Sequence, residues 1–411
     1  MASLIADKIN STTKRSLWII ALISSLAQSM AGTFVSYFGV NIGVKKWEQS
    51  IIVSSRNLGN SFFQPYWGRL SDKYGRMPFL ACGAFSMAIF NAMLLFIHEP
   101  IFLILIVILQ STIGIMFYPA YFGLIGDCST VTSRGRLMGK LSFVGLLFSV
   151  IGIMSCGFLM DASETWLSNV FIFPFIFSMI TWFLAGIIAF LGVPQPQERI
   201  QMSTKKNDVL TILRSSTMPF RRLLLVSGVY QVSMAALWPL IPFLVLEVAK
   251  TWTEIAFMWT LFTIPQAIFS PVGGWFGDKF NRKTAILLFR SLHFLIPLFY
   301  FSALLTGNYL IILTGGIISG IAIGGGDTNI NSLALDLAPE MEKASYIAML
   351  SFITGLVGFL SSLGSGILTD VLEQSGVGSS IAILGIMLLG ISILRLMAWI
   401  SHSLLKNPSK T

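Results

Sequence analysis

The fold of this chain is decided by a stretch that occurs twice. Residues 68–76 read GRLSDKYGR, and residues 274–282 read GWFGDKFNR. Both follow Gly-x-x-x-Asp-Lys-x-(Gly/Asn)-Arg, at an offset of 206 residues. Matches continue at an offset of 209 residues, where residues 141–143 (LSF) align with 350–352 (LSF). At that offset Asp127 meets Asp336 and Asp161 meets Asp370. A nearly constant offset over most of the chain indicates a duplicated unit.

Each copy of the motif lies between long apolar segments. The 411 residues are 55% hydrophobic and 11% charged, whereas about a quarter of the residues in a soluble domain are charged. Apolar runs of about 20 residues can cross ~30 Å of hydrocarbon as helices, and they lack the two-residue alternation of a membrane barrel. We expect twelve spans, at residues 17–40, 48–70, 79–97, 101–126, 138–160, 168–192, 220–246, 254–275, 284–306, 309–334, 345–369 and 379–403.

One long polar stretch divides the twelve spans into two sets of six. The predicted fold class is an all-α integral membrane protein with two pseudo-symmetric six-helix bundles, residues 1–192 and 220–411, joined by a cytoplasmic linker at 193–219. The first span has an alternative interpretation as a signal peptide, because Lys14 and Arg15 precede it. Its apolar run continues to Val40, which is longer than the apolar part of a signal peptide.

The net charge of +9 does not indicate a nucleic-acid partner, because the basic residues follow the predicted topology. With the N-terminus inside, cytoplasmic segments hold 21 of the 27 Lys and Arg residues. An excess of Lys and Arg on the cytoplasmic side is the rule for multi-pass membrane proteins. We therefore expect both termini in the cytoplasm and the chain in the plasma or inner membrane.

The sequence contains no pattern for metal binding, a cofactor or catalysis. The cysteines and histidines have no ligand spacing and are scattered along the chain, at Cys82, Cys128, Cys156, His98, His293 and His402. A phosphate-binding Gly-x-x-x-x-Gly-Lys-Ser/Thr loop does not occur, which argues against direct use of ATP. We predict neither an enzyme nor a bound cofactor.

The repeated motif predicts two tight cytoplasmic turns. Gly75 and Asn281 occupy the position where a turn requires a residue that tolerates positive φ. Gly68 and Gly274 permit close approach of helices. Asp72 and Asp278 can face a helix N-terminus, where negative charge is favoured.

These loops resemble the conserved loop motif of the major facilitator superfamily, and the resemblance extends over nearly the whole chain. It implies a secondary transporter that works by alternating access, with a substrate site near the midplane between the two repeats. It also implies that a cytoplasmic latch is formed by Gly68, Asp72, Lys73, Gly75, Arg76, Gly274, Asp278, Lys279 and Arg282. A second cytoplasmic run, with Asp127, Arg134 and Arg136, resembles the family's loop between the fourth and fifth helices and supports the same latch.

Within that family the chain is most similar to the drug:proton antiporters, although two motifs of that branch are altered. Gln110 stands where the branch has an arginine in the fourth helix, and Ile153 and Cys156 interrupt its fifth-helix motif. The resemblance implies multidrug efflux of small amphipathic compounds coupled to protons. The alternatives are uptake or exchange of a small, anionic metabolite, and a sensor or scaffold that transports nothing.

Charged and polar residues inside the spans are the candidate binding residues, because each is costly in lipid unless paired or hydrated. Asp327 is the acidic residue within a span. It is expected to bind a proton or a cationic substrate; the alternative is a structural role, as a pair with an arginine or a hydrogen bond to a neighbouring helix. Arg56, Asn57, Asn60 and Gln64 are expected to form one polar stripe in the second span, where Arg56 could attract an anion.

Tyr118 occupies the position of Asp327 in the first repeat. Other residues expected to line a central cavity are Gln28, Gln110, Tyr121, Gln231, Trp238 and Gln266. Arg290 and Arg395 are expected to reach the cytoplasmic surface with their side chains. The expected partners are a small-molecule substrate, protons and the lipid bilayer, with the protein active as a monomer.

Overall fold

The computed structural model describes residues 2–129, 134–193, 216–339 and 342–405. Within these ranges the side chains of residues 2–11, 134–136 and 343–344 are not described. Nearly all of the predicted linker at 193–219 therefore lies outside the described residues. Helices make up most of the described chain, short turns and irregular segments connect them, and the described residues contain no β-strand.

Ten helical segments in the described residues are long and apolar enough to cross a membrane. The other two expected spans are built from shorter pieces. The second is α2 (Lys46–Leu58), the π-helix η1 (Gly59–Phe63) and α3 (Gln64–Tyr74). The seventh is α10 (Met218–Ala235) and α11 (Ile241–Val248), which a turn separates. Polar residues in the second and prolines in the seventh explain why neither is a continuous apolar helix.

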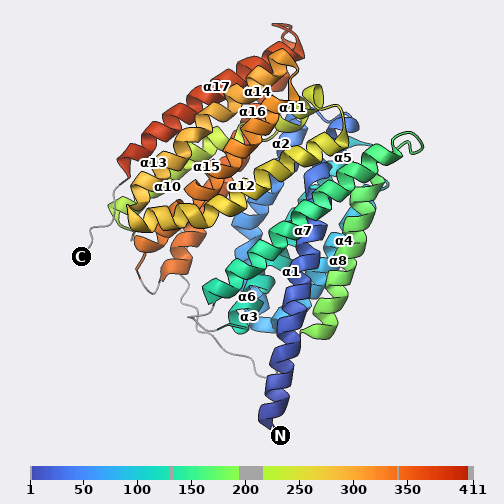
Figure 1. The fold of residues 1–411 in the computed structure, drawn as a ribbon, viewed down its shortest axis with the longest axis vertical. Coiled ribbons are helices and arrows are strands. Elements are labelled where there is room, and N and C mark those ends of the chain that lie inside the picture. The colour runs from blue at the N-terminus through green and yellow to red at the C-terminus, as the bar shows by residue number, and fades with distance from the viewer. Residues whose placement is uncertain (1, 130–133, 194–215, 340–341, 406–411) are drawn as a thin grey trace. The chain divides into compact units, whose positions relative to one another are not determined.

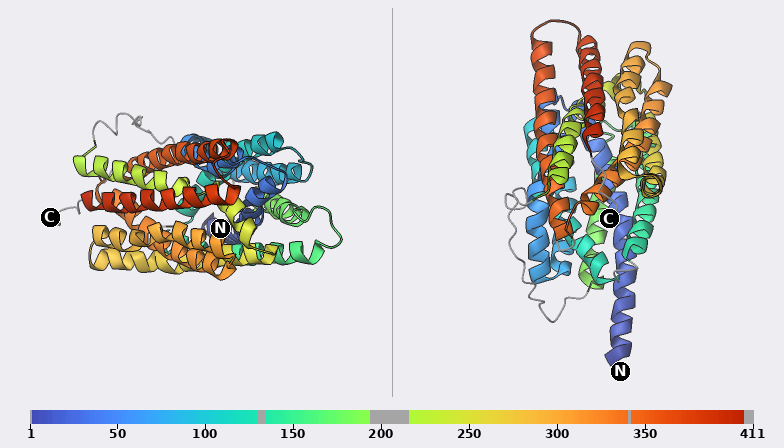
Figure 2. Two further views of the ribbon diagram at one scale, coloured as in Figure 1. Left: turned by 90° about the horizontal axis from the view of Figure 1, so that it is seen from above. Right: turned by 90° about the vertical axis from the view of Figure 1, so that its left-hand side faces the viewer.

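By compactness the chain divides into two units, one of Met1–Ile42 with Leu58–Thr204 and the other of Gly43–Asn57 with Lys205–Thr411. The division groups all of α2 except its last residue, Leu58, with the second unit. The domain limits expected from the sequence remain a prediction. Figures 1 and 2 show that the long helices of each unit run beside one another.

The first unit packs its helices around an apolar core. Its further elements are α1 (Ala2–Asn41), α4 (Arg76–Leu94), α5 (Pro100–Thr112), η2 (Gly114–Met116), α6 (Phe117–Asp127), α7 (Arg134–Ser163) and α8 (Ile172–Gly192). Phe117 and Trp182 meet edge to face in this core, with ring centroids 5.0 Å apart. Ser178 donates a hydrogen bond to the Ala27 carbonyl (2.7 Å), which joins α8 to α1.

The second unit contains a close packing of two long helices, α12 and α15. Its further elements are α12 (Trp252–Lys279), α13 (Arg282–Arg290), η3 (Ser291–Phe294), α14 (Leu295–Thr306), α15 (Tyr309–Asp336), α16 (Lys343–Gln374), α17 (Ser380–Ser401) and η5 (His402–Leu404). A β-carbon on Gly320 would lie 2.3 Å from the Phe262 carbonyl oxygen, and one on Gly324 would lie 2.5 Å from that of Gln266. Glycine at every fourth position therefore allows α15 to pack directly on the α12 backbone.

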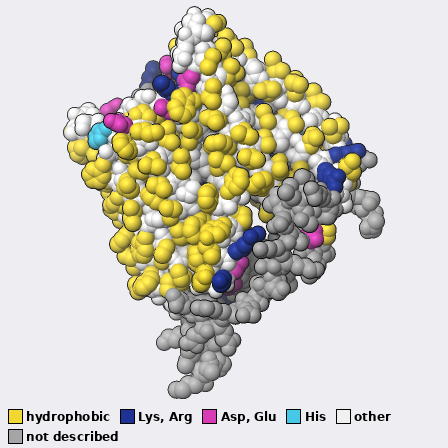
Figure 3. Space-filling model, turned by 180° about the vertical axis from the view of Figure 1, so that it is seen from behind, with side chains coloured by type: hydrophobic (Ala, Val, Ile, Leu, Met, Phe, Trp, Pro, Cys, Tyr) yellow, Lys and Arg dark blue, Asp and Glu magenta, His cyan; other side chains and the backbone are white. Residues whose placement is uncertain are grey.

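The surface of the described helices is largely apolar. On the face seen in Figure 3, hydrophobic side chains cover the body and the charged side chains gather near its margins. Large side chains such as Phe158 (66% exposed) and Leu191 (77% exposed) point outward. Such a surface is suited to hydrocarbon rather than water.

The two motif turns differ in backbone geometry. Gly75 has φ of 96°, as predicted, and separates α3 from α4. The prediction for Asn281 is wrong, because its φ of −176° is an extended conformation. Asn281 instead caps α13, where its side-chain oxygen accepts a hydrogen bond from the Thr284 amide (2.7 Å). The cap satisfies one of the amides that a helix N-terminus leaves without an intrahelical partner.

Candidate functional site

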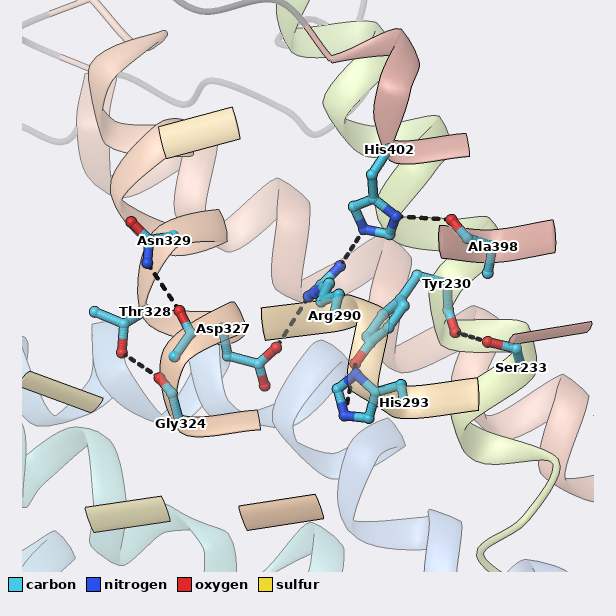
Figure 4. A network of polar contacts seen from close by, with 11 residues as sticks. Tyr230, Ser233, Arg290, His293, Gly324, Asp327, Thr328, Asn329, Ala398 and His402 are labelled. Carbon is cyan, nitrogen blue, oxygen red and sulfur yellow. Dashed lines mark hydrogen bonds and ion pairs between the residues drawn. The ribbon is translucent and has the colours of Figure 1, made fainter. Parts of the chain in front are cut away.

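Asp327 lies on α15, after the three glycines Gly324–Gly326, and pairs with an arginine of α13. Arg290 Nη2 donates to Asp327 Oδ1 at 2.9 Å (Figure 4). The Asp327 side chain is 51% exposed, whereas that of Arg290 is 4% exposed. Placing a charged side chain against hydrocarbon costs several kcal/mol of free energy. The exposed carboxylate therefore indicates that this part of α15 meets water.

Arg290 belongs to a buried polar network drawn from α10, α13, η3, α15 and η5. Its Nη1 lies 2.6 Å from Nε2 of His402, and its Cζ lies 3.5 Å from the centre of the Tyr230 ring. The Tyr230 hydroxyl in turn lies 2.7 Å from Nδ1 of His293. Figure 4 shows these side chains converging on the guanidinium. His293 and His402, which are distant in the sequence, therefore belong to one cluster.

The expectation that Arg290 and Arg395 reach the membrane surface is wrong. Each is 3% exposed and turned inward. Arg395 Nε donates to the Ser233 carbonyl (3.3 Å) and its Nη1 to the His293 carbonyl (3.1 Å). Because carbonyls near the end of α10 and in η3 accept from it, the guanidinium is stabilised inside the helix bundle. Arg395 thus links three elements of the second unit.

In the first unit the predicted site residues form two separate polar contacts. The Tyr118 hydroxyl donates to Gln28 Oε1 at 2.9 Å, which joins α6 to α1. Gln110 donates to Asn91 Oδ1 of α4 at 3.4 Å. Tyr121 stacks on Phe117, with ring centroids 5.9 Å apart. Tyr118 and Asp327 occupy equivalent positions of the repeat, yet they bond to different helices of their units.

The polar stripe predicted for the second span is altered by η1. Arg56 and Asn60 are exposed, and Asn57 and Gln64 are partly buried. The π-helical turn contains more residues than an α-turn, so it shifts Gln64 relative to the residues before it. A β-carbon on Gly59 would lie 2.0 Å from the Ser111 carbonyl oxygen, so η1 packs directly on α5. The four residues lie in α2, η1 and α3, and the polar stripe remains a prediction.

The remaining predicted cavity residues are partly buried on separate helices of the second unit. Gln231 of α10 lies against α16, where a β-carbon on Gly358 would be 2.8 Å from its Nε2. Trp238 lies in the turn between α10 and α11, and Gln266 lies on α12. Within the described residues, no hydrogen bond connects these three side chains to Asp327.

The two motif loops form matching ion-pair clusters. Arg76 at the start of α4 pairs with Asp72 of α3, and its Nε lies 3.3 Å from Asp127 Oδ2 at the end of α6. A β-carbon on Gly123 would lie 2.3 Å from Arg76 Cζ. The absence of a side chain at position 123 therefore gives the guanidinium room to reach Asp127. In the first unit one arginine thus joins the ends of the three helices α3, α4 and α6.

In the second unit Arg282 pairs with Asp278 at 2.5 Å and with Asp336 at 3.3 Å. The motif lysines Lys73 and Lys279 lie over the rings of Tyr74 and Trp275, at 5.0 and 4.9 Å. Arg134 and Arg136 begin α7, and their side chains lie outside the described residues. β-Carbons on Gly68 and Gly274 would meet neighbours at 3.5 and 3.4 Å, which is ordinary van der Waals contact. The close approach expected there occurs instead at Gly273, where a β-carbon would lie 2.4 Å from the Gly325 Cα.

The structure reveals a further polar cluster that sequence reasoning missed. Asp370 of α16 accepts from the amides of Lys46 (3.2 Å) and Trp47 (2.9 Å) at the start of α2. Lys46 Nζ also donates to Glu373 Oε1 at 2.7 Å. The match between Asp161 and Asp370 in the repeat was a signal for this residue. In the described residues no group of three His, Cys, Asp or Glu side chains is placed to hold a metal ion.

The duplication, the helical architecture and the matching ion pairs agree with a comparison to known families. The family model described as Major Facilitator Superfamily matches residues 17–227 and again residues 223–411. The chain belongs to the Major Facilitator Superfamily. It is accordingly a multi-pass membrane transporter of small molecules and not an enzyme, and the predicted all-α fold of two six-helix bundles is confirmed.

Its relatives include proteins with different names. An MFS-type transporter of Methanocaldococcus jannaschii is 21% identical over 386 residues, which cover 92% of this chain and 97% of that protein. The multidrug resistance protein MdtG of Proteus mirabilis is 24% identical over 309 residues, which cover 70% and 74%. The ZINC INDUCED FACILITATOR 1 protein of Arabidopsis thaliana is 37% identical over 83 residues, but the match spans only 17% of that protein.

Solved structures share the fold at low sequence identity. The nucleoside transporter NupG has a TM-score of 0.79 and 11% identity, over 95% of this chain and 99% of that chain. A bacterial homologue of the lysosomal transporter Spinster, in an inward-facing and unoccupied conformation, has a TM-score of 0.77 and 13% identity, over 98% and 99%.

Proposed function

We propose that this protein exports small amphipathic, cationic compounds across the cell membrane in exchange for protons. The observation that carries the proposal is the unequal exposure of the Asp327–Arg290 pair. About half of the Asp327 side-chain surface is exposed (51%), whereas the Arg290 side chain is almost fully buried (4% exposed). The accessible charge of the pair is therefore negative, and it can take a proton or attract a cation.

The altered fourth-helix motif requires the coupling proton to act elsewhere. Gln110, which replaces the arginine of the drug:proton antiporters, hydrogen-bonds Asn91 and carries no charge. Asp327 supplies a titratable group in a span, and protonation would remove the charge that holds Arg290. A proton and a cationic substrate would then compete for one carboxylate, which is the requirement for exchange.

Similarity to MdtG of Proteus mirabilis, named a multidrug resistance protein, supports export of varied compounds. Uptake of an anionic metabolite is the second candidate, because Arg56 is exposed on α2. An anion cannot reach Arg290 without rearrangement, since that side chain is 4% exposed. Measured selectivity between a cationic and an anionic probe separates these candidates.

In the proposed cycle the two arginine clusters act as latches. Arg76 with Asp72 and Asp127, and Arg282 with Asp278 and Asp336, hold helix ends together in one conformation and release them in another. We place these clusters and both termini on the cytoplasmic side of the plasma or inner membrane, and we expect a monomer to be active. Cysteine accessibility from each side of the membrane tests this orientation.

Proteoliposomes test the exchange directly. Ethidium uptake is measured with and without an imposed pH gradient, beside the anionic dye carboxyfluorescein. We expect the gradient to drive ethidium transport, and the D327N variant to lose both the gradient response and the pH dependence. E164Q is the matched control, because it removes an exposed acid from the loop after α7. A D327N rate and pH profile equal to those of the wild type would show that Asp327 does not couple transport to protons.

A further inference from the structure

The guanidinium of Arg290 is held from three sides, and the proposed function uses only one of them. Asp327 of α15 accepts at 2.9 Å, the Tyr230 ring of α10 lies beneath at 3.5 Å, and His402 of η5 lies 2.6 Å from Nη1 (Figure 4). Arg290 Nε is buried without a hydrogen-bond partner in the described residues. Among the residues that the structure describes, His402 is therefore the one acceptor, besides Asp327, of a hydrogen bond from this guanidinium.

The chemistry of the contact determines the state of the His402 ring. Arginine has five N–H donors and no acceptor, so Nε2 of His402 must offer its lone pair to Nη1. The other ring nitrogen, Nδ1, lies 2.7 Å from the Ala398 carbonyl and must carry the proton. His402 is thus neutral, with its proton on Nδ1, whenever Arg290 occupies this position.

His402 is held in place by features that do not depend on Arg290. Helix α17 ends at Ser401, so the Ala398 carbonyl is among the last four, which lack the usual partner four residues on. Next to His402, the Ser403 carbonyl accepts from Lys283 Nζ at 2.5 Å. Trp399 also donates to the Leu287 carbonyl at 2.8 Å. These bonds join the end of α17 to α13, and His402 is fully buried between them.

We propose that His402 is a positioning residue that holds Arg290 against Asp327 for the proton-coupled step. The proposal rests on the proposed function, in which Asp327 takes the coupling proton. Without an acceptor at position 402, Nη1 joins Nε as a second buried guanidinium nitrogen without a hydrogen-bond partner in the described residues, and the guanidinium can turn away from Asp327. A less firmly held guanidinium stabilises the charged carboxylate less, so exchange would respond to protons at a higher pH.

The other ionisable groups around this contact do not serve, as His402 does, as hydrogen-bond acceptors for Arg290 Nη1. Tyr230 of α10 bonds to His293 of η3, and Arg395 of α17 donates to backbone carbonyls. Lys283 of α13 contacts the Ser403 carbonyl. None of these side chains accepts a hydrogen bond from Arg290 in the described residues.

The test compares H402L, which removes the acceptor, with H402Q, whose side-chain oxygen keeps one. The readout is the pH at half-maximal gradient-driven ethidium exchange in proteoliposomes. Loss of a hydrogen bond to a charged group should move the midpoint of H402L upward by about one pH unit. H402Q should keep the wild-type midpoint, and so should H98L, which changes an exposed histidine outside the network.

The outcomes separate the two proposals. If D327N keeps the wild-type pH profile, the proposed function fails. If D327N loses its pH dependence while H402L keeps the wild-type midpoint, the positioning role of His402 is wrong and the proposed function stands.

A spectroscopic measurement covers the case in which H402L does not fold. In wild-type protein labelled with ¹⁵N-histidine, the signal absent from H402Q belongs to His402. We expect a neutral ring with the proton on Nδ1 at neutral pH. A protonated ring, or a proton on Nε2, would overturn the proposal.

Discussion

Substitution of Gly320 by alanine tests the close packing that positions α15, the helix that carries Asp327. A β-carbon at Gly320 would lie 2.3 Å from the Phe262 carbonyl oxygen and 3.0 Å from the Gln266 amide nitrogen. Both are backbone atoms of α12, so neither can rotate away as a side chain would. Since ordinary contact begins at 3.4 Å, α12 and α15 must separate locally by about 1 Å.

The expected cost follows from this geometry. Overpacking of this kind lowers the free energy of unfolding by about 1–3 kcal/mol. The better helix propensity of alanine offsets up to about 1 kcal/mol of that loss. A net loss of about 1–2 kcal/mol corresponds, for a unit of this size, to a fall in Tm of about 2–8 °C.

G364A is the matched control, because no heavy atom lies within 4 Å of a β-carbon at that position of α16. Both variants would be purified in the same detergent and unfolded by heating, with intrinsic tryptophan fluorescence as the signal. We expect a lower Tm for G320A and an unchanged or higher Tm for G364A. Equal Tm values for the two variants would refute the inference that α15 packs on the α12 backbone through Gly320.

Three further predictions concern the ends of the helices. Replacing Asn281 by alanine removes the cap of α13 and should destabilise by about 1 kcal/mol, whereas N281G should cost only a few tenths; thermal unfolding measures both, and a more stable N281G would indicate positive φ at this position. Burial, and then the charge of Asp127, raise the pKa of the Cys128 thiol, with Lys14 opposing them. Because the thiolate is the reactive form, maleimide labelling of Cys128 should be slow at neutral pH, accelerate as the pH rises and be faster in D127N; a rate independent of pH would contradict this. Replacing Arg76 by alanine should change stability by less than about 1 kcal/mol, because its acidic partners are exposed, yet it should change which side of the membrane cysteine reagents reach; unchanged accessibility would argue against a latch.

The two clusters around Arg76 and Arg282 show how far a repeat can be interpreted without coordinates. Each arginine pairs with an aspartate four residues before it, and each lies 3.3 Å from a distant aspartate, 51 residues further on in the first unit and 54 in the second. The turns between the helices nevertheless differ. Gly75 adopts positive φ, whereas Asn281 is extended and uses its side chain as a cap. Position in the repeat therefore predicted which residues form the ion pairs. It did not predict the backbone conformation of the second turn.

The environment of Asp327 was the least predictable part of the candidate site. Pairing with an arginine was one of the expected alternatives, but Arg290 was expected to face the membrane surface. Its partners Tyr230 and His402 lie on other helices, far away in the sequence. No local pattern signals such a cluster, because its members meet only when α10, α13, α15 and the end of α17 have packed together.

Sequence alone determined the membrane environment, the helical class, the duplication and the family, because apolar length, charge placement and repeated spacing are properties of the linear chain. Only the tertiary structure decided which charged side chains are buried, which are exposed and which partners they bind. The Asp327 side chain is half exposed, although Gly324 packs on the α12 backbone and Gly326 on Arg290 of α13. Arg290 is buried because three other elements surround it with acceptors and an aromatic ring. Burial and pairing depend on contacts between distant segments, and these form only when the helices assemble.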